Sequence, residues 1–369
     1  MITVGGSARE VAEHARAVRD AGARFVLYFY SSDLSRDVIH DTLTREIPSA
    51  AVAGCSMIGG WGPEGPRENG VVLMGIGDDE LSAVHLVSAT GTKDDPVAAA
   101  DTLMAELGRR VSVSTLSPAR HIGVVLLDGL ALGERIIRRL SESLPIPLVG
   151  GAAADELTFE ETTVAADGSV LSDGVVLAIL EMRVPFHYGH YVHYQPTKTE
   201  FTVTDAHPDS RTIWAIDGTP AAEYYARLLG LSSVEEITVD HFSVNPFGVV
   251  IGDEVYVRSP NAVVDGRGIR LYCYIEAGTR LRLLTQGDII ANARDALQEA
   301  EEHLGSVRGA ILFNCVLRYL EMKNTPGLLD RFAGVFDGPE VVGINTYGEE
   351  LFTHHNQTLT ARFIGGQDA

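Results

Sequence analysis

The chain has 369 residues, of which 45% are hydrophobic, so it is long enough to bury a sizeable core in two domains or one large duplicated one. Its formal net charge of -21 repels phosphate backbones and anionic lipid, which argues against nucleic acid or a membrane surface as a partner. The N-terminus lacks a signal-peptide pattern, and only three scattered cysteines occur. We therefore expect a cytoplasmic protein with reduced thiols.

The N-terminal part predicts an alternation of helices and buried strands. The capping box Ser7–Glu10 indicates a helix over residues 8–21, and the apolar run 25–30 is typical of a strand covered on both faces. A second helix follows over residues 34–47, with Val38 among the apolar residues near one face, and a short strand at 50–53 runs into a glycine.

The same order of elements occurs twice more. Strands at 122–127 and 310–313 are each followed by a helix and then by a strand that ends at a glycine. In all three copies the first strand and this glycine are about 30 residues apart, which is the length of a βαβ unit. We interpret the pattern as an internal repeat, in which each copy adds a further strand, at 70–76, 174–180 and 357–363.

Residues 185–285 differ from the rest of the chain. Alternating or aromatic strands and hairpin turns such as Asp265-Gly266 predict an antiparallel β-rich segment, followed by an amphipathic helix over 289–304. The predicted fold class is therefore α/β, with repeated βαβ units forming two pseudo-equivalent lobes around this segment. We place the boundary at the Pro185 break, which gives domains of residues 1–184 and 185–369.

Polar residues gather where the strand at 341–344 ends. Asn345, Tyr347 and Glu349 follow it, and open α/β sheets bind ligands at such strand ends. Glu349 suits an ammonium or guanidinium group, and the Tyr347 hydroxyl suits a carbonyl. The alternative is that Asn345 caps a turn and that Glu349 is solvated.

Two other strand ends carry candidate ligand-binding groups. Gly150-Gly151 through Asp155 offers backbone amides beside a carboxylate, although a tight crossover of small residues explains the same pattern. Arg318 suits a bidentate grip on a carboxylate, with a surface salt bridge as the alternative. Thiol chemistry at Cys55 or Cys315 is a weaker hypothesis, because free cysteines are more often buried as small hydrophobes.

Four histidines are candidate haem ligands. They form the pairs His190 with His193 and His354 with His355, and any haem would be b-type because the sequence has no CxxCH motif. Adjacent residues of a strand face opposite ways, so at most one of His354 and His355 would point into a pocket. The alternative for each is a surface or hydrogen-bonded core histidine.

Four segments together resemble one protein family. They are Val52-Ala53-Gly54-Cys55-Ser56, Leu148 through Asp155, Cys315-Val316-Leu317-Arg318, and Thr346-Tyr347-Gly348-Glu349 with the downstream Asn356-Gln357-Thr358. Over most of its length the chain resembles the FIST family, bacterial sensory proteins built from paired FIST N-terminal and C-terminal domains. The resemblance implies small-molecule binding and signalling to an output module, and some relatives bind haem and respond to nitric oxide.

We therefore expect a sensory protein that binds a small ligand between two lobes. Because recognisable sensor sequence fills the chain, we expect signalling in trans, through a histidine kinase or another regulator. A binding protein is favoured over an enzyme, and the alternative is a b-type haem protein acting as a gas sensor or a haem-dependent enzyme. The predicted ligand-binding residues are Cys55, Ser56, Gly150, Gly151, Asp155, Cys315, Arg318, Asn345, Tyr347, Glu349 and Asn356.

Overall fold

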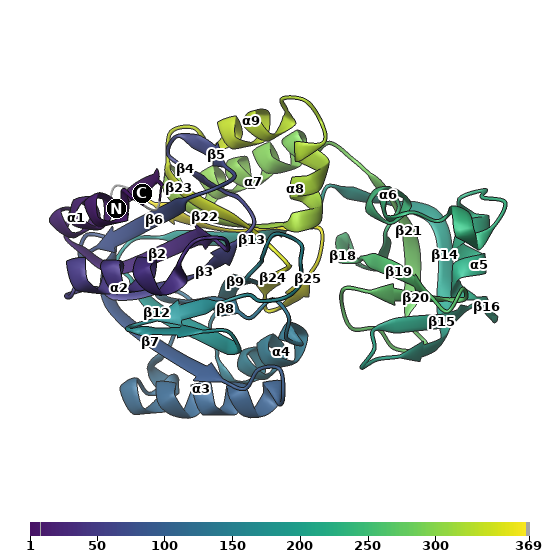
Figure 1. The fold of residues 1–369 in the computed structure, drawn as a ribbon, viewed down its shortest axis with the longest axis horizontal. Coiled ribbons are helices and arrows are strands. Elements are labelled where there is room, and N and C mark those ends of the chain that lie inside the picture. The colour runs from purple at the N-terminus through teal and green to yellow at the C-terminus, as the bar shows by residue number, and fades with distance from the viewer. Residues whose placement is uncertain (8, 367–369) are drawn as a thin grey trace. The chain divides into compact units, whose positions relative to one another are not determined.

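The computed structural model describes residues 1–7 and 9–366 and divides the chain into two compact units (Figure 1). Unit 1 comprises residues 1–191, 293–354 and 359–369, and unit 2 comprises residues 192–292 and 355–358. In the described part of the chain, none of the helices combines the length and the apolar character that crossing a bilayer requires.

The described residues of unit 1 form three six-stranded sheets with the same plan. The first has the order β1 (Ile2–Gly6), β6 (Val71–Gly77), β2 (Ala23–Ser31), β3 (Ala51–Met57), β10 (Val164–Ala166) and β11 (Ser169–Leu171). The second has the order β7 (Leu81–Thr90), β12 (Gly174–Met182), β8 (His121–Leu127), β9 (Leu148–Ala152), β24 (Gly348–Leu351) and β25 (Thr353–His355). The third has the order β13 (Phe186–Tyr191), β26 (Leu359–Gly365), β22 (Val307–Cys315), β23 (Glu340–Thr346), β4 (Gly60–Gly62) and β5 (Gly65–Arg67).

Each sheet is built around one parallel pair of strands, which is the predicted βαβ unit. The pairs are β2 with β3, β8 with β9, and β22 with β23, and the strand on the other side of each pair is antiparallel. We call these three copies the first, second and third repeats. The three copies expected from the sequence are confirmed. All three lie in unit 1, whereas the sequence had suggested two pseudo-equivalent lobes.

A hairpin from another repeat completes every sheet. The hairpin β4–β5 follows β3 in the chain but pairs with β23, β10–β11 follows β9 but pairs with β3, and β24–β25 follows β23 but pairs with β9. The exchange is cyclic, so the repeats cannot be separated into lobes without leaving strand edges unpaired.

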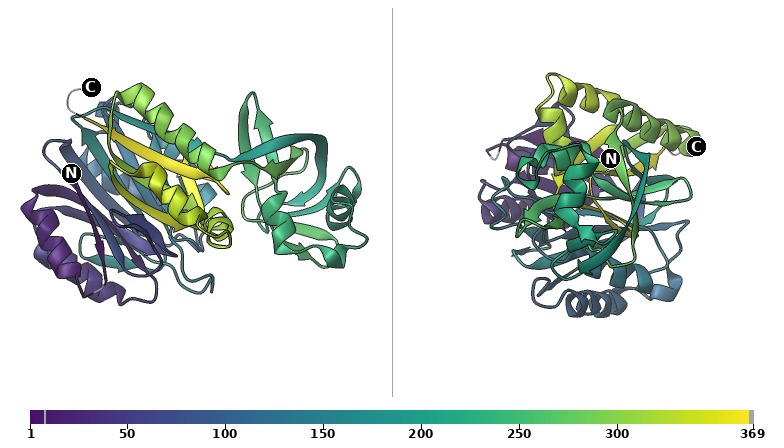
Figure 2. Two further views of the ribbon diagram at one scale, coloured as in Figure 1. Left: turned by 90° about the horizontal axis from the view of Figure 1, so that it is seen from above. Right: turned by 90° about the vertical axis from the view of Figure 1, so that its right-hand side faces the viewer.

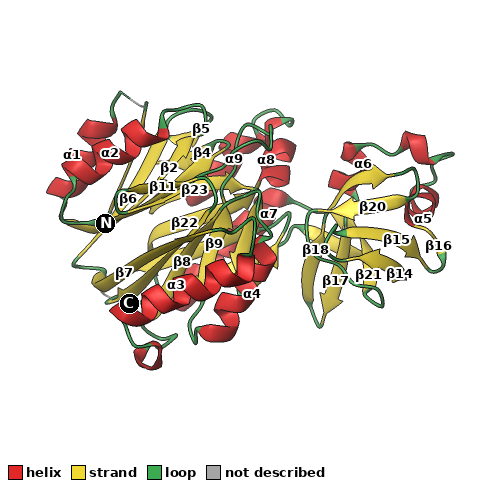
Figure 3. Cartoon of the chain, turned by 60° about the horizontal axis from the view of Figure 1, so that its bottom comes forward, coloured by secondary structure: helices red, strands yellow, loops and turns green. Residues whose placement is uncertain are grey.

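Helices cover the outer faces of the sheets (Figure 3). The first sheet carries α1 (Val11–Asp20) and α2 (Arg36–Glu46), and the second carries α3 (Pro96–Arg110) and α4 (Gly133–Ser143). The third repeat contributes α7 (Ile289–Leu304), α8 (Val316–Lys323) and α9 (Leu328–Ala333), and Figure 2 shows α7 in light green along the yellow C-terminal strands. Short 3-10 turns lie at η1 (Val113–Thr115) and η3 (Gly334–Phe336).

The inner faces of the three sheets share one apolar core. It contains inward-facing residues of all three repeats, and the rings of Phe29 and Phe313 meet edge-on with centroids 6.1 Å apart. This explains why the central strands read as continuous apolar runs, since their other face packs on helices.

Two helix predictions need correction. The helix expected from residue 8 begins at Val11, and residue 8 lies outside the described residues. In α2 the buried face carries Ile39, His40 and Leu43, whereas Val38 is 63% exposed. The polar His40 belongs to that face because its Nδ1 lies 2.9 Å from the Tyr28 hydroxyl.

Unit 2 is antiparallel throughout its described strand pairs, as predicted. Asp265 and Gly266 both have positive φ in the turn between β19 (Pro260–Val264) and β20 (Gly268–Leu271). Residues 247–258 form a hairpin that turns at Gly252. The elements are β14 (Tyr194–His207), β15 (Thr212–Ile216), β16 (Thr219–Pro220), α5 (Ala221–Leu228), η2 (Val234–Glu236), α6 (Val239–Val244), β17 (Phe247–Ile251), β18 (Glu254–Arg258), β19 (Pro260–Val264), β20 (Gly268–Leu271) and β21 (Arg280–Gln286).

Candidate functional site

A buried hydrogen-bond network lies at the strand ends of the third repeat. The Asn345 amide donates to the carbonyl oxygens of Ile58 and Gly59 at 2.8 and 3.1 Å, and its Oδ1 accepts from Asn314 Nδ2 at 3.0 Å. Asn314 Oδ1 in turn accepts from Arg318 Nε at 2.9 Å. The predicted residues Asn345 and Arg318 are thus brought together, both fully buried, and they tie the end of β23 to the turn after β3.

Glu349 belongs to the same buried region. Its Oε1 lies 2.8 Å from the Thr346 hydroxyl, and the residue faces Gly151 across the β24–β9 pair. A Cβ at Gly151 would lie 2.6 Å from Thr346 Cγ2, and one at Gly150 would lie 1.8 Å from the carbonyl oxygen of Val125. Close packing of strands therefore requires both glycines, whatever they contribute to a ligand.

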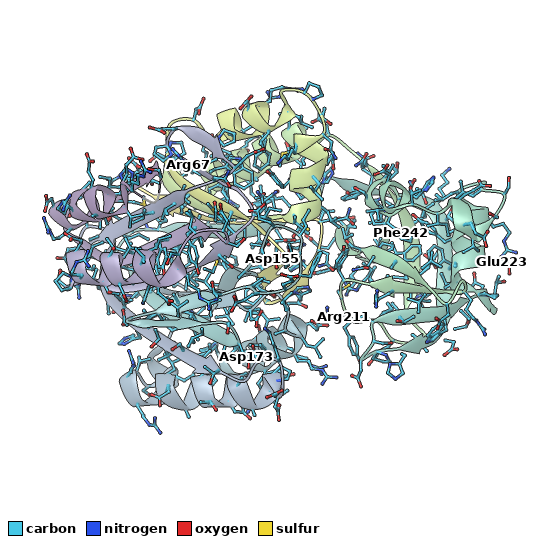
Figure 4. The ribbon with its side chains drawn as sticks, in the orientation of Figure 1. Arg67, Asp155, Asp173, Arg211, Glu223 and Phe242 are labelled. Atoms are coloured by element: carbon cyan, nitrogen blue, oxygen red, sulfur yellow. The ribbon has the colours of Figure 1, made fainter. Side chains whose placement is uncertain are left out.

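Asp155, which Figure 4 labels, and Tyr347 form the second part of the site. The Asp155 carboxylate accepts from the Tyr347 hydroxyl, from Thr158 Oγ1 at 2.9 Å and from the backbone N–H groups of Phe159 and Glu160 at 3.1 and 2.9 Å. Burial raises the pKa of the Asp155 carboxyl, but these donors, led by the Tyr347 hydroxyl, hold it below its usual value. Burial and the Asp155 carboxylate raise the pKa of Tyr347, so its hydroxyl stays protonated.

The segment 156–161 covers this pair. The Phe159 ring stacks on the Tyr347 ring with centroids 4.7 Å apart and planes 16° apart, and Phe159 is 48% exposed. Leu157 and Phe159 have φ of 64° and 55°, a region that costs a non-glycine residue free energy. We call this segment the cover loop, and its shape is held by the hydrogen bonds to Asp155.

The predicted cysteines and Ser56 occupy buried strand ends. Burial raises the pKa of the Cys55 thiol, which disfavours the thiolate that nucleophilic chemistry needs. Cys315 is 2% exposed at the N-terminus of α8, and Ser56 Oγ accepts from the Thr163 N–H at 3.1 Å.

Two findings decide the family. The model of the FIST N domain matches residues 24–219, and the model of the FIST C domain matches residues 221–351. The chain belongs to the FIST family. FIST domains are in general sensory, small-ligand-binding modules. The chain is also 23% identical to an uncharacterized protein of Methanocaldococcus jannaschii in an alignment 290 residues long, which covers 74% of this chain and 53% of that relative.

The structure of this FIST protein distributes the candidate haem ligands between its units. His354 Nδ1 lies 2.8 Å from Glu350 Oε1, and its ring packs on Gly348, where a Cβ would lie 2.9 Å from His354 Nε2. His190 is also in unit 1, whereas His193, His355 and the predicted ligand-binding Asn356 lie in unit 2. His355 stacks on Tyr256 with ring centroids 5.8 Å apart, and the His193 ring lies tilted against the Tyr194 ring with centroids 4.2 Å apart.

Sequence reasoning missed a buried cation in the third repeat of this FIST protein. Arg362 in β26 is fully buried, and its Nη2 lies 2.6 Å from Met182 Sδ. The described residues offer no hydrogen-bond partner to its Nε or Nη1. Arg362 pairs with Ile311 across β26 and β22. At the position equivalent to Arg362 the first repeat has Met74 and the second repeat has Ala178.

The same comparison applies two residues earlier in the strand. Thr360 stands where the other repeats have Val72 and Val176, and its hydroxyl is buried without a partner among the described residues. The polar and charged residues of the core are thus concentrated in the third repeat. Aligning the three copies position by position was the sequence signal that could have found them.

Proposed function

We propose that this FIST protein senses a small polar ligand that binds at the strand ends of the third repeat, beneath the cover loop. One observation carries the proposal. An exposed aromatic ring, Phe159, is held over the half-buried phenol of Tyr347 and the buried carboxylate of Asp155 by backbone in a costly conformation. Such strain persists where the surroundings enforce it, and it is often found at ligand clamps.

The cover loop supplies an element with two states. Its closed form depends on Asp155, which accepts hydrogen bonds from the loop backbone, and on the stack of Phe159 on Tyr347. Each positive φ costs on the order of 1–3 kcal/mol. A ligand that takes over the Asp155 carboxylate and the Tyr347 ring face would therefore release the loop, and this change is the signal.

The charges around the loop favour a cationic ligand group. Burial raises the pKa of Glu156, and the nearby carboxylates, first that of Asp33, raise it further against the opposing effect of Lys323. A clustering of carboxylates is relieved by a bound ammonium or guanidinium, which also forms charge-assisted hydrogen bonds with Asp155.

Calorimetric titration tests the ligand class. We expect full-length protein to bind putrescine or arginine in preference to succinate, and D155N to weaken that binding at least about tenfold by removing the charged acceptor. F159A should strengthen it, because the ligand no longer competes with the stack. The matched control is F352A, since Phe352 is also 48% exposed and has a φ of 56°. Absence of binding, or equal affinities in F159A and F352A, would overturn the proposal.

We further propose that the signal passes in trans to a regulator such as a histidine kinase. The exposed Phe159 supports this, because release of the cover loop changes the surface that a partner meets. Pull-downs of the full chain with and without putrescine, followed by mass spectrometry, should recover a kinase in a ligand-dependent way. Identical recovery of every protein in both conditions would count against it.

A further inference from the structure

Two histidines and a glutamate meet on the surface of unit 1, away from the strand ends. His187 comes from β13, and Glu299 and His303 lie one turn apart on the same face of α7. Their ligand atoms all lie within 4.8 Å of one another. His187 Nε2 is 3.3 Å from Glu299 Oε1, and the two imidazole rings stack with centroids 4.3 Å apart.

The donor set fits a zinc ion, whose binding would turn the two stacked imidazole rings so that their nitrogen lone pairs converge on the metal. Two imidazoles and one carboxylate, with water at the fourth position, form a common tetrahedral Zn²⁺ site. With bonds of about 2.0–2.1 Å, two ligand atoms of such a site lie about 3.3–3.4 Å apart. The 3.3 Å between His187 Nε2 and Glu299 Oε1 already matches this spacing.

A hydrogen bond prepares His303 to act as a ligand. Its Nδ1 lies 2.8 Å from the backbone carbonyl oxygen of Glu299, to which it donates. This bond selects the tautomer whose Nε2 carries the lone pair, as in most histidine–metal sites. The residue thus needs no rearrangement of its tautomer to bind a metal.

Solvent can reach the three side chains. The Glu299 side chain is 47% exposed and that of His187 15%, which leaves the site open to solvent. The Tyr191 hydroxyl lies 3.5 Å from His187 Nε2, within reach of a metal-bound water.

We propose that His187, Glu299 and His303 form a Zn²⁺ site that joins β13 to α7. The chain leaves unit 1 after Tyr191, at the end of β13, and returns to it at Ala293, within α7. The metal therefore fixes the two segments that flank residues 192–292, the larger part of unit 2. Zinc binding would hold these segments in one arrangement, independently of any ligand at the strand ends.

The second repeat provides a matched control. His85 in β7 pairs with Ile179, as His187 in β13 pairs with Phe363, so the two histidines occupy equivalent positions. Among the described residues, the set that fits a metal includes His187 but not His85. H85A therefore removes a similar side chain from a similar strand without touching the proposed site.

Calorimetry with ZnCl2 on untagged, full-length protein tests the proposal, with Co²⁺ absorption as a second readout. We expect one saturable site, intense visible Co²⁺ bands typical of tetrahedral coordination, and at least about tenfold weaker binding in H187A, H303A and E299Q but not in H85A. Zinc should raise the melting temperature of the wild type and of H85A only. The absence of a saturable site, or equal zinc affinity in H303A and H85A, would overturn the assignment. Melting curves recorded without metal serve as the control that each variant folds.

Discussion

Replacing Arg362 with methionine should stabilise the protein. Arg362 is fully buried between the sheets, its Nη2 contacts a thioether sulfur, and its Cζ lies 5.9 Å from the centroid of the Phe186 ring. The described surroundings offer no carboxylate to its Nε or Nη1. Methionine is the residue that the first repeat has at the equivalent position, and its unbranched side chain is close to that of arginine in length.

The size of the effect follows from the desolvation of the guanidinium. Burial lowers the pKa of Arg362 well below its usual value, to about 9. At about 1.4 kcal/mol per pKa unit, holding the charge in the core costs up to roughly 5 kcal/mol, which is an upper bound. Replacing buried charges with apolar residues has given about 1–4 kcal/mol, and imperfect packing reduces the gain. We expect R362M to gain about 1–3 kcal/mol, or several degrees in melting temperature.

Guanidinium denaturation of wild type and R362M measures this difference. The pH dependence gives a second check, because a base with a depressed folded-state pKa destabilises the fold fully below about pH 9 and progressively less as the pH rises towards its unfolded-state pKa. The difference in the free energy of unfolding between R362M and wild type should therefore become smaller between pH 8 and about pH 10.5. A variant that is less stable than wild type, or a gap that does not change with pH, would refute the reasoning.

Three further predictions concern the strand ends and the histidines. The donors around Asp155 depress the pKa of its carboxyl, so the stability that the ionised carboxylate contributes is present above the unfolded-state pKa and is lost as the pH falls through the lower folded-state value. D155N should lower the free energy of unfolding by about 1–3 kcal/mol at pH 7 and should flatten its dependence on acidic pH. Denaturation curves in which D155N and the wild type lose stability alike at acidic pH would contradict this prediction. G151A should lower the free energy of unfolding by only about 1–3 kcal/mol, because the Thr346 methyl group can shift away from the new Cβ. In G150A the new Cβ meets the Val125 carbonyl oxygen, so circular dichroism should detect no folded protein. A folded G150A would show that the β8–β9 pair can move apart, against this prediction. The b-type haem alternative predicts a Soret band after addition of haemin that a single histidine variant abolishes, and a protein that stays colourless removes it.

Patterns within one repeat were readable from the sequence. The apolar runs that became β2, β8 and β22 identified the three βαβ units, because strands covered on both faces leave no polar alternation. The polar cluster at the end of β23 was likewise found, since turn glycines and hydrogen-bonding side chains mark strand ends. Asn345 and Arg318 do lie in one network, as their shared position after parallel strands suggests.

Features that depend on the pairing of strands far apart in the sequence could not be predicted. The hairpin strand β4 has three residues, and its partner β23 lies about 280 positions further along the chain, so no local pattern specifies the pairing. The side of α2 that faces the core was misjudged because the polar His40 is buried by its contact with Tyr28. Arg362 escaped notice because a single charged residue within an apolar strand reads as an irregularity until the copies are compared.

The cyclic exchange of hairpins has a consequence for synthesis on the ribosome. The first sheet is complete once β11 has left the exit tunnel. The edge of β9 stays unpaired until β24 has been synthesised. The hairpin β4–β5 likewise stays unpaired until its partner β23 has been synthesised late in the chain. For most of translation, therefore, a nascent chain exposes unpaired, apolar strand edges. A ribosome that stalls before residue 340 would leave a chain with two incomplete sheets, which makes this protein a natural client for chaperones that bind extended segments.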